Sequence, residues 1–190
     1  FSFLVRDVVE MGRTPWTKQS TREHDRVVVD AALNVAGVAH LQDRDVTTLS
    51  GGERARVAFA RILAQQTPIV FLDEPTAAMD IRFQQRTLGT VRQLAQAGRT
   101  VVVVLHDLQA AAAYCDHFVC LSHGTVSAAG NLDEVYTDEV LSRVYDWPIH
   151  VERTERGVYV RPEKEERIDA DTSTLFDICL LYTSPSPRDA

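Results

Sequence analysis

Features that mark several protein classes are scarce in this sequence. It has only three cysteines, none in a Cys-x-x-Cys pair, which excludes a disulfide scaffold and a zinc signature and favours a reducing compartment. Its apolar runs, such as residues 101–105, are far shorter than the roughly 20 residues of a membrane-spanning helix. We find neither an internal repeat nor a sustained heptad pattern, so long coiled coils are not expected.

Basic residues are also in the minority. The chain carries 20 Lys and Arg against 27 Asp and Glu, a net charge of −7, which argues against a nucleic-acid-binding surface. The remaining composition is that of a globular protein, with 190 residues of which 45% are hydrophobic and 25% charged. This is enough chain for about one domain with its own core.

Both ends of the chain have an unusual composition. The chain begins at Phe1 on a strand-like run, so we expect a piece that lacks an N-terminal segment. Hydrophobic periodicity stops at about Asp169, and residues 180–190 have the composition of a flexible or non-native tail. We therefore expect residues 161–190 to be a disordered and partly non-native tail.

The first 48 residues favour helices. Ser20 and Glu23 form a possible capping box, and Gly37 is a plausible end for the helix that it opens. The stretch 12–17, which contains a proline, predicts a loop. Residues 52–64 repeat their apolar side chains with helical spacing and predict a helix with one buried stripe.

Two wholly apolar runs, residues 69–72 and 100–105, predict strands buried on both faces of a parallel sheet. The helical stretch 81–97 lies between them and is closed by Gly98, so the three segments predict a βαβ unit. The later segments predict a helix, a hairpin, one or two short helices and a last hairpin, at residues 108–115, 118–129, 133–145 and 149–160.

Small residues precede the helix predicted at residues 52–64. Ser50, Gly51 and Gly52 would leave backbone N–H groups free to bind an anion, and the helix dipole adds positive potential there. The Ser50 hydroxyl can donate a hydrogen bond as well. A capped helix with a tight glycine turn is the alternative interpretation.

Acidic residues follow the first predicted strand. Asp73 and Glu74 would lie at its carboxyl end, the edge where open α/β sheets bind ligands. An aspartate there can hold Mg²⁺ through water, and a glutamate can polarise an attacking water. His106 ends the second strand and shares this edge if the strands are neighbours. The alternatives are ordinary loop carboxylates and a surface or capping histidine.

Together these motifs resemble the nucleotide-binding domain of ATP-binding cassette (ABC) proteins, over about residues 1–160. The matching segments are the signature motif, the Walker B motif, the D-loop and the switch histidine, at residues 49–53, 69–74, 77–80 and His106. The resemblance implies an α/β fold: a P-loop NTPase (RecA-like) ABC ATPase core with a helical subdomain, incomplete at the N-terminus. Residues 1–48 would be the partial helical subdomain and residues 49–160 the signature helix and core.

The resemblance also implies roles for these residues and ATP and Mg²⁺ as cofactors. Asp73 would hold Mg²⁺ through water. Glu74 would be the general base or orient the attacking water, and His106 would contact the γ-phosphate. The remaining cofactor-binding residues would contact ATP held by the other subunit of a dimer: Ser50, Gly51, Gly52 and Glu53. Asp80, also among the cofactor-binding residues, would link the two sites across the dimer.

One family motif is not found. The Walker A string Gly-x-x-x-x-Gly-Lys-Ser/Thr does not occur in these residues, and neither the stacking aromatic nor the Q-loop glutamine can be placed. Phe1 would fall just after the Q-loop. The chain therefore predicts half-sites only, and a fragment without activity of its own is an alternative to an ATPase.

The subtype is indicated by two segments. Residues 8–16 look like the segment after the Q-loop in ATPases of iron-siderophore, haem and cobalamin importers, where it forms part of the surface that grips the membrane subunit. Residues that merely suit packing are the alternative. Residues 144–151 also resemble this group, which favours haem or ferric siderophore as the transported substrate. We do not interpret His117, His123 or His150 as haem ligands.

This resemblance implies an ATP-hydrolysing importer subunit and its partners. These would be a second ATPase subunit in a homodimer, transmembrane permease subunits and a periplasmic or lipoprotein substrate-binding protein, with no nucleic acid. The subunit would lie at the cytoplasmic face of the inner or plasma membrane, attached through the permease.

Two other kinds of cassette ATPase are alternatives. A translation-associated cassette usually carries Pro-Thr-Asn-His-Leu-Asp after Walker B, whereas residues 75–80 are Pro-Thr-Ala-Ala-Met-Asp, as in transporters. A chromosome-maintenance or DNA-repair cassette would need long coiled coils.

Overall fold

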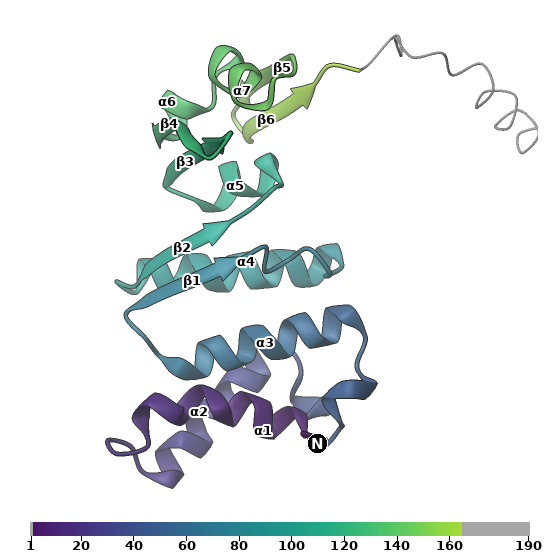
Figure 1. Cartoon of the computed structure of the whole chain (residues 1–190), viewed down its shortest axis with the longest axis vertical. Helices are drawn as coiled ribbons and strands as arrows, with labels where there is room; N and C mark the ends of the chain where they lie inside the picture. Colours follow the sequence, from purple (N-terminus) through teal and green to yellow (C-terminus); the bar gives the residue numbers. More distant parts are fainter. Residues whose placement is uncertain (1, 165–190) are drawn as a thin grey trace, which may run out of the picture.

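The computed structural model describes residues 2–164, and its elements stack in layers from α1 at one end to β5 and β6 at the other (Figure 1). Residues 165–190, most of the predicted tail, lie outside the described residues. The first residues of that tail differ from the prediction, because β6 continues to Pro162 and the Glu163 amide donates a hydrogen bond of 2.9 Å to the Pro148 carbonyl. The helices are α1 (Val5–Glu10), η1 (Met11–Trp16), α2 (Arg22–Val35), η2 (Ala39–Leu41), η3 (Val46–Thr48), α3 (Gly51–Gln65), α4 (Ile81–Gln96), α5 (Leu108–Tyr114), α6 (Leu132–Val135) and α7 (Asp138–Tyr145), where η marks a 3₁₀ helix. The strands are β1 (Ile69–Asp73), β2 (Thr100–Val104), β3 (His117–Ser122), β4 (Thr125–Asn131), β5 (Ile149–Thr154) and β6 (Gly157–Pro162).

The first layer is helical, as predicted, with two local differences. The loop predicted at residues 12–17 is mostly the 3₁₀ helix η1, which accommodates Pro15 because short 3₁₀ turns need few backbone donors. The cap of α2 is Thr21 rather than Ser20, since the Thr21 hydroxyl accepts a hydrogen bond from the His24 amide.

The helical layer and the first sheet share one hydrophobic core. The central helix α3 contributes Val57, Phe59 and Ala60, all nearly inaccessible. The core continues from α1 and α2 on one side of α3 to β1 and α4 on the other. The N-terminal helices therefore hold α3 against the strands that follow it.

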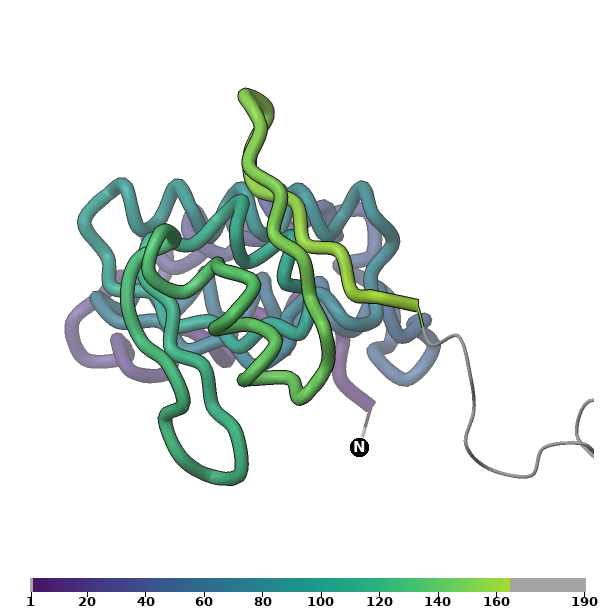
Figure 2. The backbone as a smooth tube through the Cα atoms, turned by 90° about the horizontal axis from the view of Figure 1, so that it is seen from above, coloured from purple at the N-terminus to yellow at the C-terminus, as the bar shows by residue number. Residues whose placement is uncertain are grey.

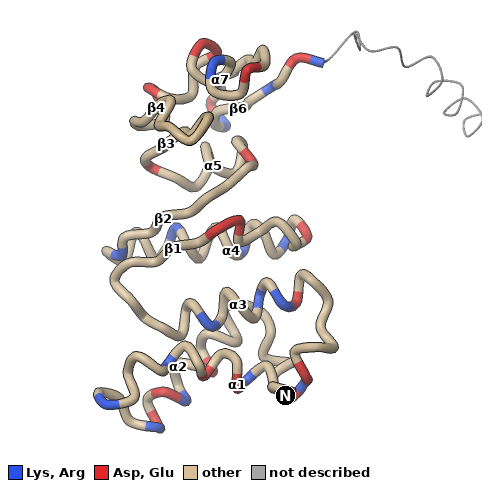
Figure 3. The backbone as a smooth tube through the Cα atoms, in the orientation of Figure 1, with Lys and Arg blue, Asp and Glu red and all other residues tan. Residues whose placement is uncertain are grey.

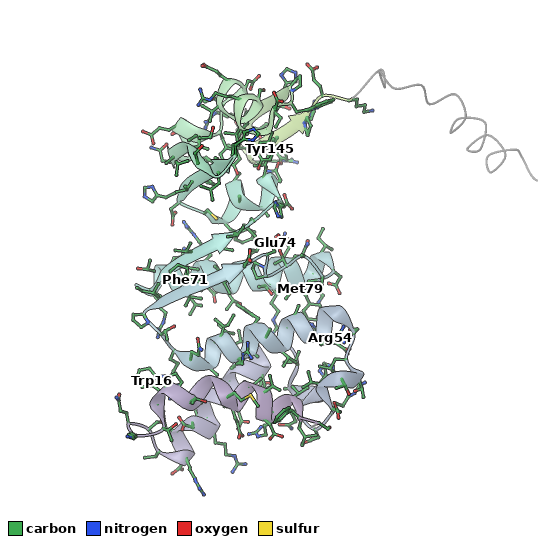
Figure 4. All side chains as sticks on the ribbon, viewed as in Figure 1. Trp16, Arg54, Phe71, Glu74, Met79 and Tyr145 are labelled. Carbon is green, nitrogen blue, oxygen red and sulfur yellow. The ribbon has the colours of Figure 1, made fainter. Side chains whose placement is uncertain are left out.

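Strands β1 and β2 pair in parallel, with Ile69 opposite Thr100 and Asp73 opposite Val104. The predicted βαβ unit is confirmed, but the prediction that both strand faces are buried is wrong. Val70 and Leu72 enter the core, whereas Phe71 is 72% exposed (Figure 4). Helices cover only one face of this two-stranded sheet in the described part of the chain, so alternate side chains remain in solvent.

The C-terminal elements have a second core. Phe118 of β3 and Tyr136 pack edge to face with their ring centroids 4.9 Å apart, and Leu141 of α7 is fully buried beside them. The Tyr136 hydroxyl donates a hydrogen bond of 2.9 Å to the Leu108 carbonyl, which ties this part to α5. Figure 2 shows the turns of the β3–β4 and β5–β6 hairpins projecting on opposite sides of the stack.

Candidate functional site

The parallel register brings Glu74 and His106 together at the carboxyl edge of β1 and β2. The Glu74 amide donates a hydrogen bond of 3.1 Å to the Val104 carbonyl, so the pairing of the strands extends one residue beyond β1. His106 follows β2, and its Nε2 lies 2.7 Å from Glu74 Oε1. Both side chains are exposed. In Figure 3 the acidic pair, Asp73 and Glu74, forms a red segment where β1 ends.

Glu74 has an unusual backbone. Its φ is +42°, in the left-handed region that residues other than glycine rarely adopt. The hydrogen bond of its amide to Val104 and a bond of 3.2 Å from the Ala77 amide to its carbonyl hold this conformation. Such strain persists only where neighbouring contacts determine it, and it turns the side chain of Glu74 toward His106 at the open edge.

Ser50 begins α3 as its N-cap. The Ser50 hydroxyl accepts from the Glu53 amide at 3.3 Å and lies 2.8 Å from Glu53 Oε2, to which it donates. The Ser50 amide also donates to Glu53 Oε2, at 2.8 Å, which completes a capping box. These bonds to its carboxylate hold the pKa of Glu53 below its usual value of 4.5. The same geometry therefore fits both interpretations of this segment: it is a capped helix, and its N-terminus is exposed.

The D-loop packs against the start of α3. A Cβ on Gly52 would lie 2.9 Å from the Ala78 carbonyl oxygen, so only glycine lets these two backbones approach so closely. Asp80 caps α4 by accepting a hydrogen bond of 3.0 Å from the Phe83 amide. The motif pattern placed Ala78 in the D-loop but did not predict this contact, because a backbone carbonyl makes it and no side-chain pattern reveals such a partner.

The predicted site residues thus fall into two neighbouring groups. Asp73, Glu74 and His106 share the sheet edge, while Ser50, Gly51 and Gly52 lie at the N-terminus of α3. Figures 1 and 4 show both groups on the same side of the molecule, with Arg54 near that end of α3 and Glu74 at the end of β1. The chemical roles of these residues stay predictions.

The residues at the sheet edge suit a magnesium ion that is shared with phosphate groups. Asp73 presents an exposed carboxylate at the end of β1, and no cluster of three or more His, Cys, Asp or Glu side chains among residues 2–164 forms a metal cage. Mg²⁺ commonly uses one or two carboxylates together with water and substrate phosphates, so a single aspartate fits this donor set.

A separate cavity of about 1010 Å³ lies in the helical layer. It is bordered by α1, η1, α2 and the turn after η2, and its walls include Arg6, Glu10, Arg13, Asp25 and Asp30. The walls are thus rich in charges of both signs. Among the described helices, none is both long enough and apolar enough to cross a membrane.

The sequence matches known proteins along most of its length. Residues 4–77 match the family model described as ABC transporter. The chain is 46% identical over 169 residues to the hemin import ATP-binding protein HmuV of Rhodococcus jostii, a match that covers 88% of this chain and 58% of the relative. It is 49% identical over 147 residues to the cobalamin import ATP-binding protein BtuD of Halobacterium salinarum, covering 77% of this chain and 37% of that protein. The chain spans about half the length of the curated relatives that it matches.

Solved structures share the fold. A structure described as a metal-chelate type ABC transporter in an inward-facing conformation superimposes with a TM-score of 0.74 at 28% identity, over 86% of this chain and 68% of that chain. An ATP-binding cassette solved as a dimer with ADP and Pi superimposes with a TM-score of 0.63 at 28% identity, over 68% of this chain and 57% of that chain. With the geometry described above, these matches lead to one conclusion. The chain belongs to the ABC transporter family and has the fold of its nucleotide-binding domain.

Proposed function

We propose that this chain is part of the ATP-hydrolysing subunit of an ABC importer for haem or ferric siderophore. The observation that carries the proposal is the pairing of Glu74 with His106, 2.7 Å apart, at a sheet edge that also presents Asp73. A carboxylate and an imidazole at this edge, beside an aspartate that can hold Mg²⁺, suit hydrolysis of a phosphoanhydride.

In this proposal Glu74 and His106 divide the work at the sheet edge. The Glu74 carboxylate orients the attacking water and accepts its proton, because it is exposed on the edge where the substrate phosphates would lie. The His106 imidazole holds the Glu74 side chain and contacts the γ-phosphate. Asp73 would hold Mg²⁺, which supplies positive charge that neutralises the phosphate oxygens.

The N-terminus of α3 serves the opposite subunit of a dimer. Ser50, Gly51 and Gly52 present backbone N–H groups at the positive end of the helix dipole, which suits the γ-phosphate of ATP bound by the partner. The Ser50 hydroxyl donates to Glu53 in the free chain, and it would transfer this hydrogen bond to a phosphate oxygen. Asp80, at the start of α4, would link the two composite sites.

The importer assignment rests on the names of the relatives and on the helical layer. Relatives 46% and 49% identical are named as hemin and cobalamin import proteins. The charged cavity beside α1 and η1 includes part of residues 8–16, the segment that resembles the surface gripping the membrane subunit. The subunit would therefore act at the cytoplasmic face of the membrane, bound to a permease that receives its substrate from a binding protein.

A complementation assay tests the composite site. We define the extended domain as this chain with the N-terminal part of an ABC ATPase, from the Walker A motif through the Q-loop, joined ahead of Phe1. The extended domain with Ser50→Arg supplies an accepting half-site but no donating half-site. Addition of the unmodified chain, which carries Ser50, should restore phosphate release.

The control is the same chain with Ser50→Arg, which should restore nothing. Rescue that persists with this variant would refute the composite site, because the γ-phosphate contact would then come from other residues. Rescue by neither chain, when both are folded and soluble, would also count against the proposal.

A further inference from the structure

The short helix η1 is docked on the C-terminal turn of α3. A Cβ on Gly12 would overlap with the Arg61 carbonyl oxygen, well inside the closest contact that a side chain allows. The obstructing atom belongs to the backbone of α3, so it cannot move aside as a flexible side chain could. Any side chain at this position would therefore push η1 away from α3.

Two donors of η1 bind the last carbonyls of α3. The Arg13 guanidinium is 6% exposed, and its Nη1 donates to the Ala64 carbonyl at 2.8 Å. The Trp16 indole N–H donates to the Gln65 carbonyl at 2.6 Å. Carbonyls in the last turn of a helix have no donor within the helix, and a cation there also interacts favourably with the helix dipole.

The same guanidinium also binds α2. Its Nε donates to Asp25 Oδ1 at 2.7 Å, and its Nη1 lies 2.9 Å from Gln66 Oε1. The guanidinium of Arg13 therefore joins η1, α2 and the end of α3 through a rigid planar group. A lysine has one ammonium on a flexible stem and cannot reproduce this fork.

The other end of α3 carries the predicted γ-phosphate-binding residues. The helix has 15 residues, so it spans about 22 Å as a stiff rod. Figure 4 shows Trp16 beside one end of α3 and Arg54 near the other, where Ser50 and Gly52 lie. A change in how η1 holds the C-terminal turn would therefore tilt or shift the N-terminal turn.

We propose that Arg13 is a positioning residue for the N-terminus of α3. By fixing the C-terminal turn of α3 against η1 and α2, Arg13 sets where Ser50 and Gly52 stand relative to the phosphate that they bind. This inference rests on the proposed function, since it assumes that the start of α3 binds a phosphate. Arg13 itself lies at the far end of the helix and touches no reacting group.

The test compares turnover with nucleotide affinity in dimers of the extended domain. Arg13→Ala should lower kcat by about 10-fold or more, because a displacement of about 1 Å in a binding group has effects of this size. The Kd for ATP of the isolated extended domain should change less than about twofold, because one subunit binds ATP through its Walker A segment. Arg13→Lys should restore little of the lost kcat.

Two further variants make the test decisive. Arg143→Ala, a matched control on α7 with an exposed side chain that does not line the charged cavity, should leave kcat and Kd unchanged. Trp16→Phe removes one hydrogen bond with little loss of volume, and it should lower kcat by about two- to fivefold. If Arg13→Ala does not fold, this variant decides the outcome. An unchanged kcat in folded Arg13→Ala or, failing that, in Trp16→Phe would overturn the inference.

Ser50→Arg separates this inference from the proposed function. If Ser50→Arg abolishes turnover while the variants at Arg13 and Trp16 are fully active, only the positioning role fails. If Ser50→Arg leaves turnover unchanged, the start of α3 binds no essential phosphate and the proposed composite site fails first.

Discussion

Nε2 of His106 lies 2.7 Å from Oε1 of Glu74, although the two residues are 32 positions apart in the sequence. Each follows a strand of the same parallel pair, and the register places both at one edge. The left-handed backbone of Glu74 turns its side chain into this contact. The proximity of a carboxylate and an imidazole at an open edge is the geometry on which the first prediction depends.

Glu74→Gln in the extended domain should lower the rate of ATP hydrolysis by about 10²- to 10⁴-fold, the usual effect of removing a general base. The amide keeps the shape and the contact with His106 but cannot accept a proton from water. ATP binding should survive, so dimers with bound ATP should accumulate. Phosphate release and size-exclusion chromatography measure the two effects, and near-normal turnover would exclude Glu74 as the base.

Gly52→Ala should destabilise the chain by about 1 kcal/mol, because its Cβ would lie 2.9 Å from the Ala78 carbonyl oxygen and overpacking outweighs the better helix propensity of alanine. Gly89→Ala in α4 is the matched control. Nothing lies within 4 Å of a Cβ built there, so this change should stabilise the chain by about 0.5–1 kcal/mol. Thermal unfolding of both variants gives the two signs, and equal signs would contradict the close approach of the D-loop.

His150 should make the stability of the C-terminal hairpin depend on pH. Hydrogen bonds with Glu163, at 2.9 Å, and with Asp138, at 3.1 Å, raise the pKa of His150 above its usual value of 6.5. The stabilisation is therefore fully present below about pH 6.5 and is lost as the pH rises through the higher pKa of the folded chain. Hydrogen bonds from Val151 and His150 lower the pKa of Asp138, so at the acid end its contribution is lost only as the pH falls through that lowered value.

His150→Gln should therefore lower the Tm more at pH 6 than at pH 9. The control is His40→Gln, whose side chain lies in an exposed position of η2. Thermal unfolding followed by circular dichroism at both pH values measures the difference. A Tm loss for His150→Gln that does not vary with pH would show that these ion pairs do not stabilise the hairpin.

Leu141→Ala should destabilise the second core by about 2–5 kcal/mol. Leu141 is fully buried in α7, among residues of β3, β5 and β6, and its truncation leaves a cavity there. Val126→Ala in β4 is a control for loss of apolar volume, because that side chain is 61% exposed. Denaturant unfolding measures both changes, and a small effect of Leu141→Ala would mean that this core is loosely packed.

The local elements of the fold were predictable from the sequence. The helical spacing in residues 52–64, the two apolar runs and the glycine at 98 each depend on neighbouring residues, and the structure has α3, β1, β2 and the end of α4 in these places. The parallel pairing of β1 and β2 could also be predicted from the sequence, because two apolar strands joined by a helix can be arranged in only a few ways. The family resemblance followed from the residues, order and spacing of four motifs.

The sequence by itself determined which residues could form the site: the acidic pair after β1, the histidine after β2 and the small residues that begin α3. Only the tertiary structure decided that one face of β1 and β2 is open, that Gly52 abuts the Ala78 carbonyl, and that the Arg13 guanidinium is buried. The physical reason is distance along the chain. Arg13 binds the carbonyl of a residue 51 positions away, and no local pattern of apolar or polar residues encodes such a partner.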